Sequence, residues 1–341
     1  PRREVPRQLL SETYISRVIY SVVAAGALLW WMWLGRGTTF FYDEWDFIMA
    51  YHVGLWDAMM RPHVGQFVAV PVLVYRAMFA LAGLAHYWPY RLVGIVFELA
   101  MTTVTFAYLE RRTGSAMALV ATIAVMGAGQ GWQDILWPFE LTFTISLAGG
   151  IGALLLLDRG GRAAEVCAAV CLVVSVASSG FGLVFIAGIA AEAIWAAACL
   201  RGRGMTALAW GAVRDRLAHA WVVGPGLGLY VAWYIHGHVG DAVLSRLHEV
   251  PGYVAQSAGY GVGSLFGLHS VRAGEVLAAA IGAVLLARLI TDWTTGGRTA
   301  MAVTAALTFW VLDGLASVVS RKYALIGGRL WHAPCYPRPG P

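Results

Sequence analysis

The residues best suited to chemistry are three carboxylates in "FFYDEWDF", directly after the first long apolar segment: Asp43, Glu44 and Asp46. Charged residues make up only 13% of the chain, and clustering acids at a membrane boundary costs desolvation unless they are used. Asp43 and Glu44 suit an enzyme that removes a proton or binds a charged donor. The alternative is a solvated loop at a helix end. Asp46 fits a helix cap or a solvated position.

Two further segments carry polar groups with aromatic neighbours. "HVGQF" supplies His63 and Gln66, and a neutral imidazole near a carboxylate can orient a sugar or move a proton. The alternative is a polar turn. "GQGWQDILWPFE" joins Trp rings, which stack on sugar C–H groups, to acids that accept hydroxyl donors. Its candidate substrate-binding residues are Gln133, Asp134, Trp137 and Glu140.

Two arginines are candidates for binding phosphate. Arg321 follows the last apolar stretch in "SRKY", with Tyr323 beside it, and Arg76 lies within the apolar stretch 67–84. A guanidinium fork binds two phosphate oxygens at once. Either arginine can instead extend to lipid headgroups, with its aliphatic part in the apolar layer.

The composition is typical of a polytopic membrane protein. Hydrophobic residues make up 59% of the 341 residues, more than a soluble domain of this size carries. The net charge of +5 is small and arises from Arg in short connections, so we expect contact with lipid and not with nucleic acid. The four cysteines have no metal-ligand spacing and form no disulfide framework.

We predict an all-α fold with about nine transmembrane helices. The apolar runs lie near 15–34, 92–109, 115–131, 138–157, 163–178, 181–200, 218–235, 273–291 and 299–318.

The stretch 67–84 is ambiguous, because it carries Pro71 and Arg76 and can either span the membrane or lie along its surface. If it does not cross, most basic residues fall in cytoplasmic connections, as the positive-inside rule requires. We therefore expect 36–91 to be one external segment with membrane-surface helices. The same side then collects the acids, 63–67, 129–140, 178–182, 320–323 and the long loop that begins at His236 and runs to 272.

The order of these segments resembles the bacterial membrane glycosyltransferases of the GT-C superfamily, of the actinobacterial multi-pass type and distantly similar to protein O-mannosyltransferases. The resemblance rests on "YDEWDF", "HVGQFVAVPVLVYRAMFALAGL", "GWQDILWPFELTFTISLAGGIGALLLLDR", "SSGFGLVF" and "SRKY", and covers about residues 15–326. One departure is Lys322, which stands between Arg321 and Tyr323 where the family pattern places Arg directly before Tyr.

The resemblance implies a plasma-membrane enzyme that transfers a sugar from a polyprenyl-phosphate donor to an extracytoplasmic glycan, lipid or protein. Asp43 would be the general base, and Glu44 would shape the same pocket. Either no cofactor is required, or Asp43 and Glu44 hold a divalent cation. Asp134 matches the acid of the second external loop, and Arg321, together with Arg76, would bind the donor phosphate.

Two other functional classes remain open. Glu98 and Asp313 lie inside expected spans, where acids can serve a proton path, so a transporter or flippase of a lipid-linked intermediate is the main rival. The Pro-rich end, 327–341, reads as a disordered or truncated tail behind a single domain, 1–326, which leaves an inactive remnant as the third possibility.

Overall fold

The computed structural model describes residues 7–63, 65–127, 135–201, 220–237, 244–268, 270–291, 306–308 and 310–311. These residues form helices joined by short connections, and their only strand-like pairing is an isolated antiparallel bridge between His63 and Gln66. The expected all-α class is therefore confirmed for this part of the chain.

Three helical segments among the described residues are long and apolar enough to cross a membrane: Glu12–Gly37, Trp88–Thr113 and Pro138–Arg159. The first includes most of α1 (Arg7–Leu34), and the other two contain α5 (Trp88–Thr113) and α8 (Leu141–Arg159). At 1.5 Å per residue, the 26 residues of α5 extend about 39 Å, more than the hydrocarbon core of a bilayer. A membrane protein is thus plausible on length and composition.

Further helices coincide with most of the other apolar ranges. They are α6 (Ser115–Met126), α9 (Arg162–Val176), α10 (Phe181–Arg201), α12 (Ala220–Gly237) and α14 (Val271–Thr291). The last expected span, 299–318, lies mostly outside the described residues. Helices thus occupy eight of the expected ranges. Three of these ranges hold the helical segments that are long and apolar enough to span a membrane.

The expected long loop 236–272 is wrong. It contains a 3₁₀ helix, η5 (Leu244–Glu249), and the 16-residue helix α13 (Val250–Leu265), which packs on α14. The glycines of α13 are usually helix breakers, but here they allow close packing. A Cβ at Gly259 would lie 2.6 Å from the Cγ of Glu275 in α14.

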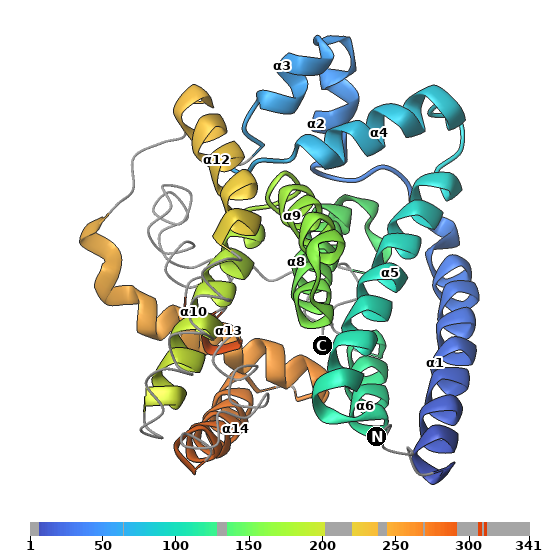
Figure 1. Cartoon of the computed structure of the whole chain (residues 1–341). Coiled ribbons are helices and arrows are strands. Elements are labelled where there is room, and N and C mark those ends of the chain that lie inside the picture. Colours follow the sequence, from blue (N-terminus) through green and yellow to red (C-terminus); the bar gives the residue numbers. More distant parts are fainter. Residues whose placement is uncertain are drawn as a thin grey trace.

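Three short helices form a layer at one end of the long ones, at the top of Figure 1: α2 (Glu44–Met49), α3 (Leu55–Met60) and α4 (Ala69–Ala82). We call residues 44–82 the peripheral layer. The 14 residues of α4 extend about 21 Å, short of the roughly 30 Å of a bilayer core, and α4 runs across the direction of α1 and α5 (Figure 1). These features favour a surface position for 67–84.

Residues distant in sequence hold the peripheral layer in place. The Val70 amide donates to the Ala177 carbonyl (3.0 Å), which ties the start of α4 to the turn between α9 and α10. The Trp233 indole of α12 donates to the Met60 carbonyl (2.9 Å), and its ring stacks on Phe67 with centroids 5.0 Å apart. The acids, 63–67, the turn after α9 and the end of α12 are therefore brought to one end of the molecule.

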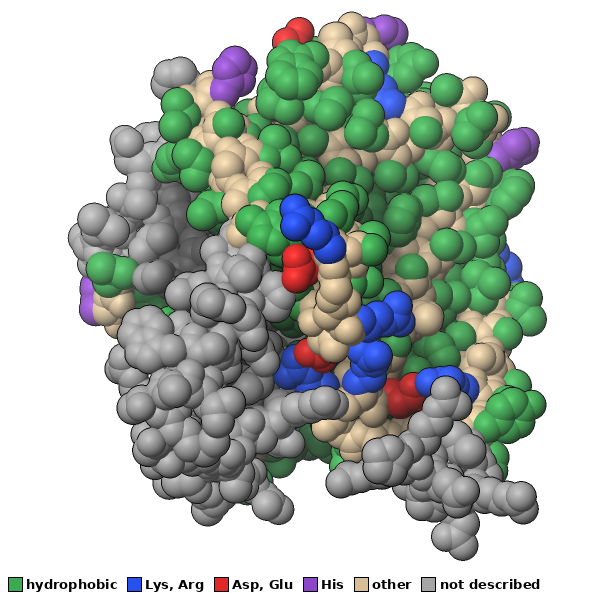
Figure 2. All heavy atoms as spheres, in the orientation of Figure 1, with side chains coloured by type: hydrophobic (Ala, Val, Ile, Leu, Met, Phe, Trp, Pro, Cys, Tyr) green, Lys and Arg blue, Asp and Glu red, His purple; other side chains and the backbone are tan. Residues whose placement is uncertain are grey.

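Ion pairs join the helices at the other end. Arg17 of α1 pairs with Glu110 of α5 at 2.8 Å, and Arg112 pairs with Asp158 of α8 at 2.9 Å. In Figure 2 most of the charged side chains lie in the centre and lower part of the view, whereas the right-hand margin is mainly hydrophobic.

Candidate functional site

The first turn of α2 presents Asp43 and Asp46 on one side of the helix. Asp43 is the N-cap residue but makes no capping hydrogen bond with its side chain, so its carboxylate is not used by the helix end. Asp46 lies three residues later, which places it on the same face. Tyr42, just before them, has a φ of +49°, a conformation that non-glycine residues rarely adopt and that costs energy to hold.

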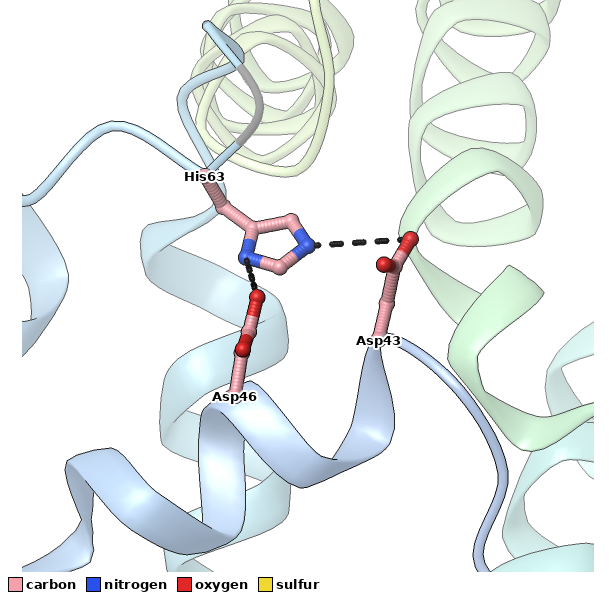
Figure 3. Close-up of side chains that lie close together, drawn as sticks. All are labelled: Asp43, Asp46 and His63. Carbon is pink, nitrogen blue, oxygen red and sulfur yellow. Dashed lines mark ion pairs between the residues drawn. The ribbon is translucent and has the colours of Figure 1, made fainter.

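His63 lies between the two carboxylates, as Figure 3 shows. Its Nε2 is 3.9 Å from the Asp43 Oδ2, and its Nδ1 is 3.7 Å from the Asp46 Oδ2. The ring is held by Phe47, stacked at a centroid distance of 5.3 Å, and by Phe139 at 5.2 Å. The histidine side chain is 12% exposed, against 25% for Asp43 and 56% for Asp46. The exposed fraction of the side chain therefore increases from His63 through Asp43 to Asp46.

Gln66 positions His63 and does not join the carboxylates. Two backbone hydrogen bonds close the turn between them, from the His63 amide to the Gln66 carbonyl (3.0 Å) and from the Gln66 amide to the His63 carbonyl (2.8 Å). Gly65 in this turn has a φ of +81°, which favours glycine. The Gln66 Oε1 accepts a 2.9 Å hydrogen bond from Ser179, so the turn is fixed to the residues that follow α9.

Glu44, expected beside Asp43 in a catalytic pair, is fully buried. Its Oε1 accepts a hydrogen bond from the Tyr75 hydroxyl of α4 (2.8 Å). Its Oε2 accepts hydrogen bonds from the Tyr87 hydroxyl (2.8 Å) and from the Phe41 amide (3.0 Å). Both oxygens are thus occupied, and Glu44 connects α2 to α4 and to the start of α5. These contacts favour a role in fixing α2 over contact with a substrate.

Burial raises the pKa of the Glu44 carboxyl above its ordinary value, although the hydrogen bonds from Tyr75, Tyr87 and Phe41 oppose this shift. Burial, and then the neighbouring carboxylate, raise the pKa of Tyr75 well above its usual value. The Tyr75 hydroxyl therefore remains a proton donor to Glu44.

Arg91 of α5 is buried against the turn that leads to the acids, a contact that the sequence does not predict. It is 3% exposed. Its guanidinium lies 3.4 Å from the carbonyls of Met32 and Thr38, which stand before and after the turn that leads from α1 to the acids. It approaches so closely that a Cβ on Gly35 would lie 2.6 Å from the Arg91 Cδ. In the sequence, only Gly35 of "GRG" hints at this contact, because a residue without a Cβ permits the close approach of Arg91.

Arg76 does not reach the acid trio through any contact among the described residues. One of its terminal nitrogens donates to the carbonyls of Ala50 (2.8 Å) and Val53 (2.6 Å), and its guanidinium lies 5.2 Å from the Tyr51 ring centroid. Arg76 therefore joins α4 to the connection between α2 and α3. These contacts favour a structural role over phosphate binding.

Aromatic rings pack together at the residues that precede Asp43. The Trp137 indole donates to the Phe41 carbonyl (3.3 Å), and its ring lies 5.6 Å from Phe41 and 6.3 Å from Tyr42 between centroids. Trp137 is thus brought next to the residues that precede Asp43, as a sugar-stacking role requires. Glu140 lies at the N-cap of α8 and is partly buried.

Asp43, Asp46 and His63 offer donor atoms that lie within 4.8 Å of one another. Carboxylate oxygens and an imidazole nitrogen suit a divalent cation such as Mn²⁺ or Zn²⁺. The set differs from the expected pair, because Glu44 is committed to the tyrosines. A single cation can be bound by only one of the two His63 nitrogens, together with one oxygen from each carboxylate.

Four of the expected site residues lie outside the described residues: Gln133, Asp134, Arg321 and Tyr323. Their roles stay predictions. Comparison with known proteins gives no match to a protein-family model, to a curated protein or to a solved structure.

Proposed function

We propose that this chain is a membrane glycosyltransferase that moves a sugar from a polyprenyl-phosphate donor to a hydroxyl group of an extracytoplasmic acceptor. The observation that carries the proposal is the position of Asp43, a partly exposed carboxylate beside His63 and Asp46 at the end of the first long apolar helix. A base at this level meets a lipid-linked donor in the membrane and a polar acceptor outside it.

The chemistry assigned to Asp43 is general-base catalysis. The carboxylate takes the proton of the acceptor hydroxyl while its oxygen attacks the anomeric carbon of the sugar. The bond from that carbon to the phosphate oxygen breaks, the configuration inverts, and polyprenyl phosphate leaves with the bonding electrons. Trp137 and the rings of Phe41 and Tyr42 supply faces on which the sugar can stack.

The orientation belongs to the same proposal. The basic connections lie in the cytoplasm, the chain crosses the plasma membrane about nine times, and the peripheral layer lies on the outer surface. Asp134 and Arg321 join the site from the second external loop and from beyond the last span. Support comes from the arginine distribution and from the contacts that gather residues 43–46, 63–67 and 177–179 at one end.

The test is an Asp43→Asn variant in a transfer assay with a polyprenyl-phosphate sugar. We expect turnover to fall about a hundredfold or more, because the amide cannot accept the proton. Asp57→Asn is the matched control, since Asp57 is an exposed acid in the first turn of α3. Unchanged turnover in the Asp43 variant removes it as the base. Ion-coupled substrate uptake into vesicles without a transfer product would instead identify a transporter.

The same assay separates a base from a metal ligand. We expect turnover to survive chelation by EDTA, because the proposed step uses the carboxylate alone. Loss of turnover that Mn²⁺ restores would make Asp43, Asp46 and His63 ligands of a catalytic cation.

A further inference from the structure

The C-terminal end of α12 packs against the segment that carries His63, although the two lie far apart in the sequence. Trp233 of α12 is 1% exposed, and its indole donates a 2.9 Å hydrogen bond to the Met60 carbonyl. Its ring stacks on Phe67, which is also 1% exposed, with centroids 5.0 Å apart. Met60 lies three residues before His63, and Phe67 lies four residues after it. One side chain therefore contacts both ends of the segment 60–67.

The two halves of α12 belong to different parts of the core. In the N-terminal half, Val222 is fully buried in the hydrophobic cluster formed by α5, α8, α9 and α10. In the C-terminal half, Trp233 belongs to a separate cluster that includes Phe67 and Ala69. Pro225 lies between the halves, and a proline inside a helix donates no backbone hydrogen bond and commonly bends the helix. The contacts of Trp233 are thus mainly with the peripheral layer, whereas those of Val222 are with the long helices.

The acids and His63 are held by different parts of the chain. Asp43 and Asp46 lie at the start of α2, which the buried Glu44 ties to α4 and to the start of α5. The His63 nitrogens are 3.9 Å from the Asp43 Oδ2 and 3.7 Å from the Asp46 Oδ2, which is longer than a hydrogen bond. A shift of about 1 Å would bring either pair to hydrogen-bond length, so the packing of 60–67 decides how closely the imidazole meets the carboxylates.

We propose that Trp233 is a positioning residue that sets the distance of His63 from the two carboxylates. Its hydrogen bond fixes the chain before His63, and its ring contact fixes the chain after it. The Gln66 hydrogen bond with Ser179 holds the same turn from the end of α9, so this bond and α12 together determine where the imidazole lies. The kinetic consequence rests on the proposed function, in which His63 positions Asp43 for proton transfer.

The first test follows His63 directly and needs no activity. Diethyl pyrocarbonate modifies neutral imidazoles, and mass spectrometry of the full-length protein in detergent gives the rate at each histidine. Trp233→Phe keeps a ring on Phe67 but removes the indole N–H. We expect the rate at His63 to rise about fivefold or more, because the segment opens more often, and the rates at the exposed His52 and His86 to stay unchanged.

Two further variants make this test specific. Trp221→Phe is the matched control, because it makes the same substitution in the same helix at a side chain that is 43% exposed. Phe67→Leu removes the ring stack and keeps the indole hydrogen bond, and it should also raise the rate at His63. An unchanged His63 rate in either Trp233→Phe or Phe67→Leu overturns the proposal. So does an equal rise at both control histidines, which would show a general loosening of the fold.

The second test uses sugar transfer. We expect Trp233→Phe to lower kcat about fivefold to tenfold and to leave the KM for the polyprenyl-phosphate donor unchanged, because the change alters positioning and not donor binding. In a His63→Phe background, Trp233→Phe should cause no further loss of kcat, since Trp233 acts through His63. Losses that multiply overturn the proposal. A His63 modification rate that responds to Trp233→Phe in a protein without transfer activity keeps the positioning role and rejects the glycosyltransferase.

Discussion

The Tyr75 hydroxyl donates a 2.8 Å hydrogen bond to the Glu44 Oε1, and both residues are almost completely buried. This bond joins α2, which bears Asp43 and Asp46, to α4. A buried carboxylate is costly unless its oxygens have partners, so the tyrosines are what allow Glu44 to occupy this position.

The first prediction concerns Tyr75→Phe. The ring contacts with Phe47 remain, but one Glu44 oxygen loses its donor inside the protein. We expect a loss of about 1–3 kcal/mol in the free energy of unfolding, measured by denaturant titration in detergent. Tyr51→Phe is the control, because Tyr51 is exposed and Phe keeps the ring under Arg76. Equal stability of the two variants would show that the Glu44 hydrogen bond contributes little.

The second prediction concerns pH. Since the folded-state pKa of Glu44 is raised, its contribution to stability is complete below the ordinary value of 4.5 and is lost as the pH rises through the folded-state pKa. The wild type should therefore lose more stability than Glu44→Gln when thermal unfolding is compared between pH 5 and pH 8. Asp57→Asn, an exposed acid, should follow the wild type. Parallel curves for wild type and Glu44→Gln would contradict the raised pKa.

The third prediction concerns the turn after α1. Gly35→Ala places a Cβ 2.6 Å from the Arg91 Cδ, so the buried guanidinium must move away from the carbonyls of Met32 and Thr38. We expect a loss of about 1–3 kcal/mol in unfolding free energy. Gly37→Ala is the control, since its Cβ would meet nothing within 4 Å. In an Arg91→Ala background the Gly35→Ala cost should disappear, as a double-mutant cycle can measure.

The fourth prediction separates packing from chemistry at His63. His63→Phe keeps a ring between Phe47 and Phe139 but removes both nitrogens that face the carboxylates. We expect the melting temperature to stay close to that of the wild type and sugar-transfer turnover to fall about ten- to a hundredfold, because Asp43 loses its positioning partner. Wild-type turnover in a stably folded His63→Phe variant would limit His63 to packing.

The positions of most helices along the chain could be predicted from the sequence. Apolar runs of near-spanning length predicted most of the helical ranges, because a helix at membrane depth needs a continuous apolar sequence. The distribution of arginines favoured a surface position for 67–84, and the structure has a 14-residue helix there. The helix at 250–265 was not predicted. Its glycines, which are usually helix breakers, allow close packing against α14.

The different burial of neighbouring acids could not be predicted from the sequence. Asp43 and Glu44 are adjacent and chemically alike, yet one is partly exposed and the other fully buried. The difference depends on Tyr75 and Tyr87, which lie 31 and 43 residues further along the chain. Arg91 was missed for the same reason, since its contacts are with residues 53 and 59 positions earlier. Tertiary contacts of this kind leave no periodic signal in a single sequence.

The Trp233–Met60 hydrogen bond joins residues 173 positions apart. During synthesis the chain emerges from its N-terminus, so α2, α3 and α4 exist long before α12 has been made. Until then the Met60 carbonyl and the face of Phe67 lack their indole partner. The layer that bears Glu44 and Asp46 is therefore completed by one of the later helices, and Met60 and Phe67 gain these contacts only after α12 has reached its place.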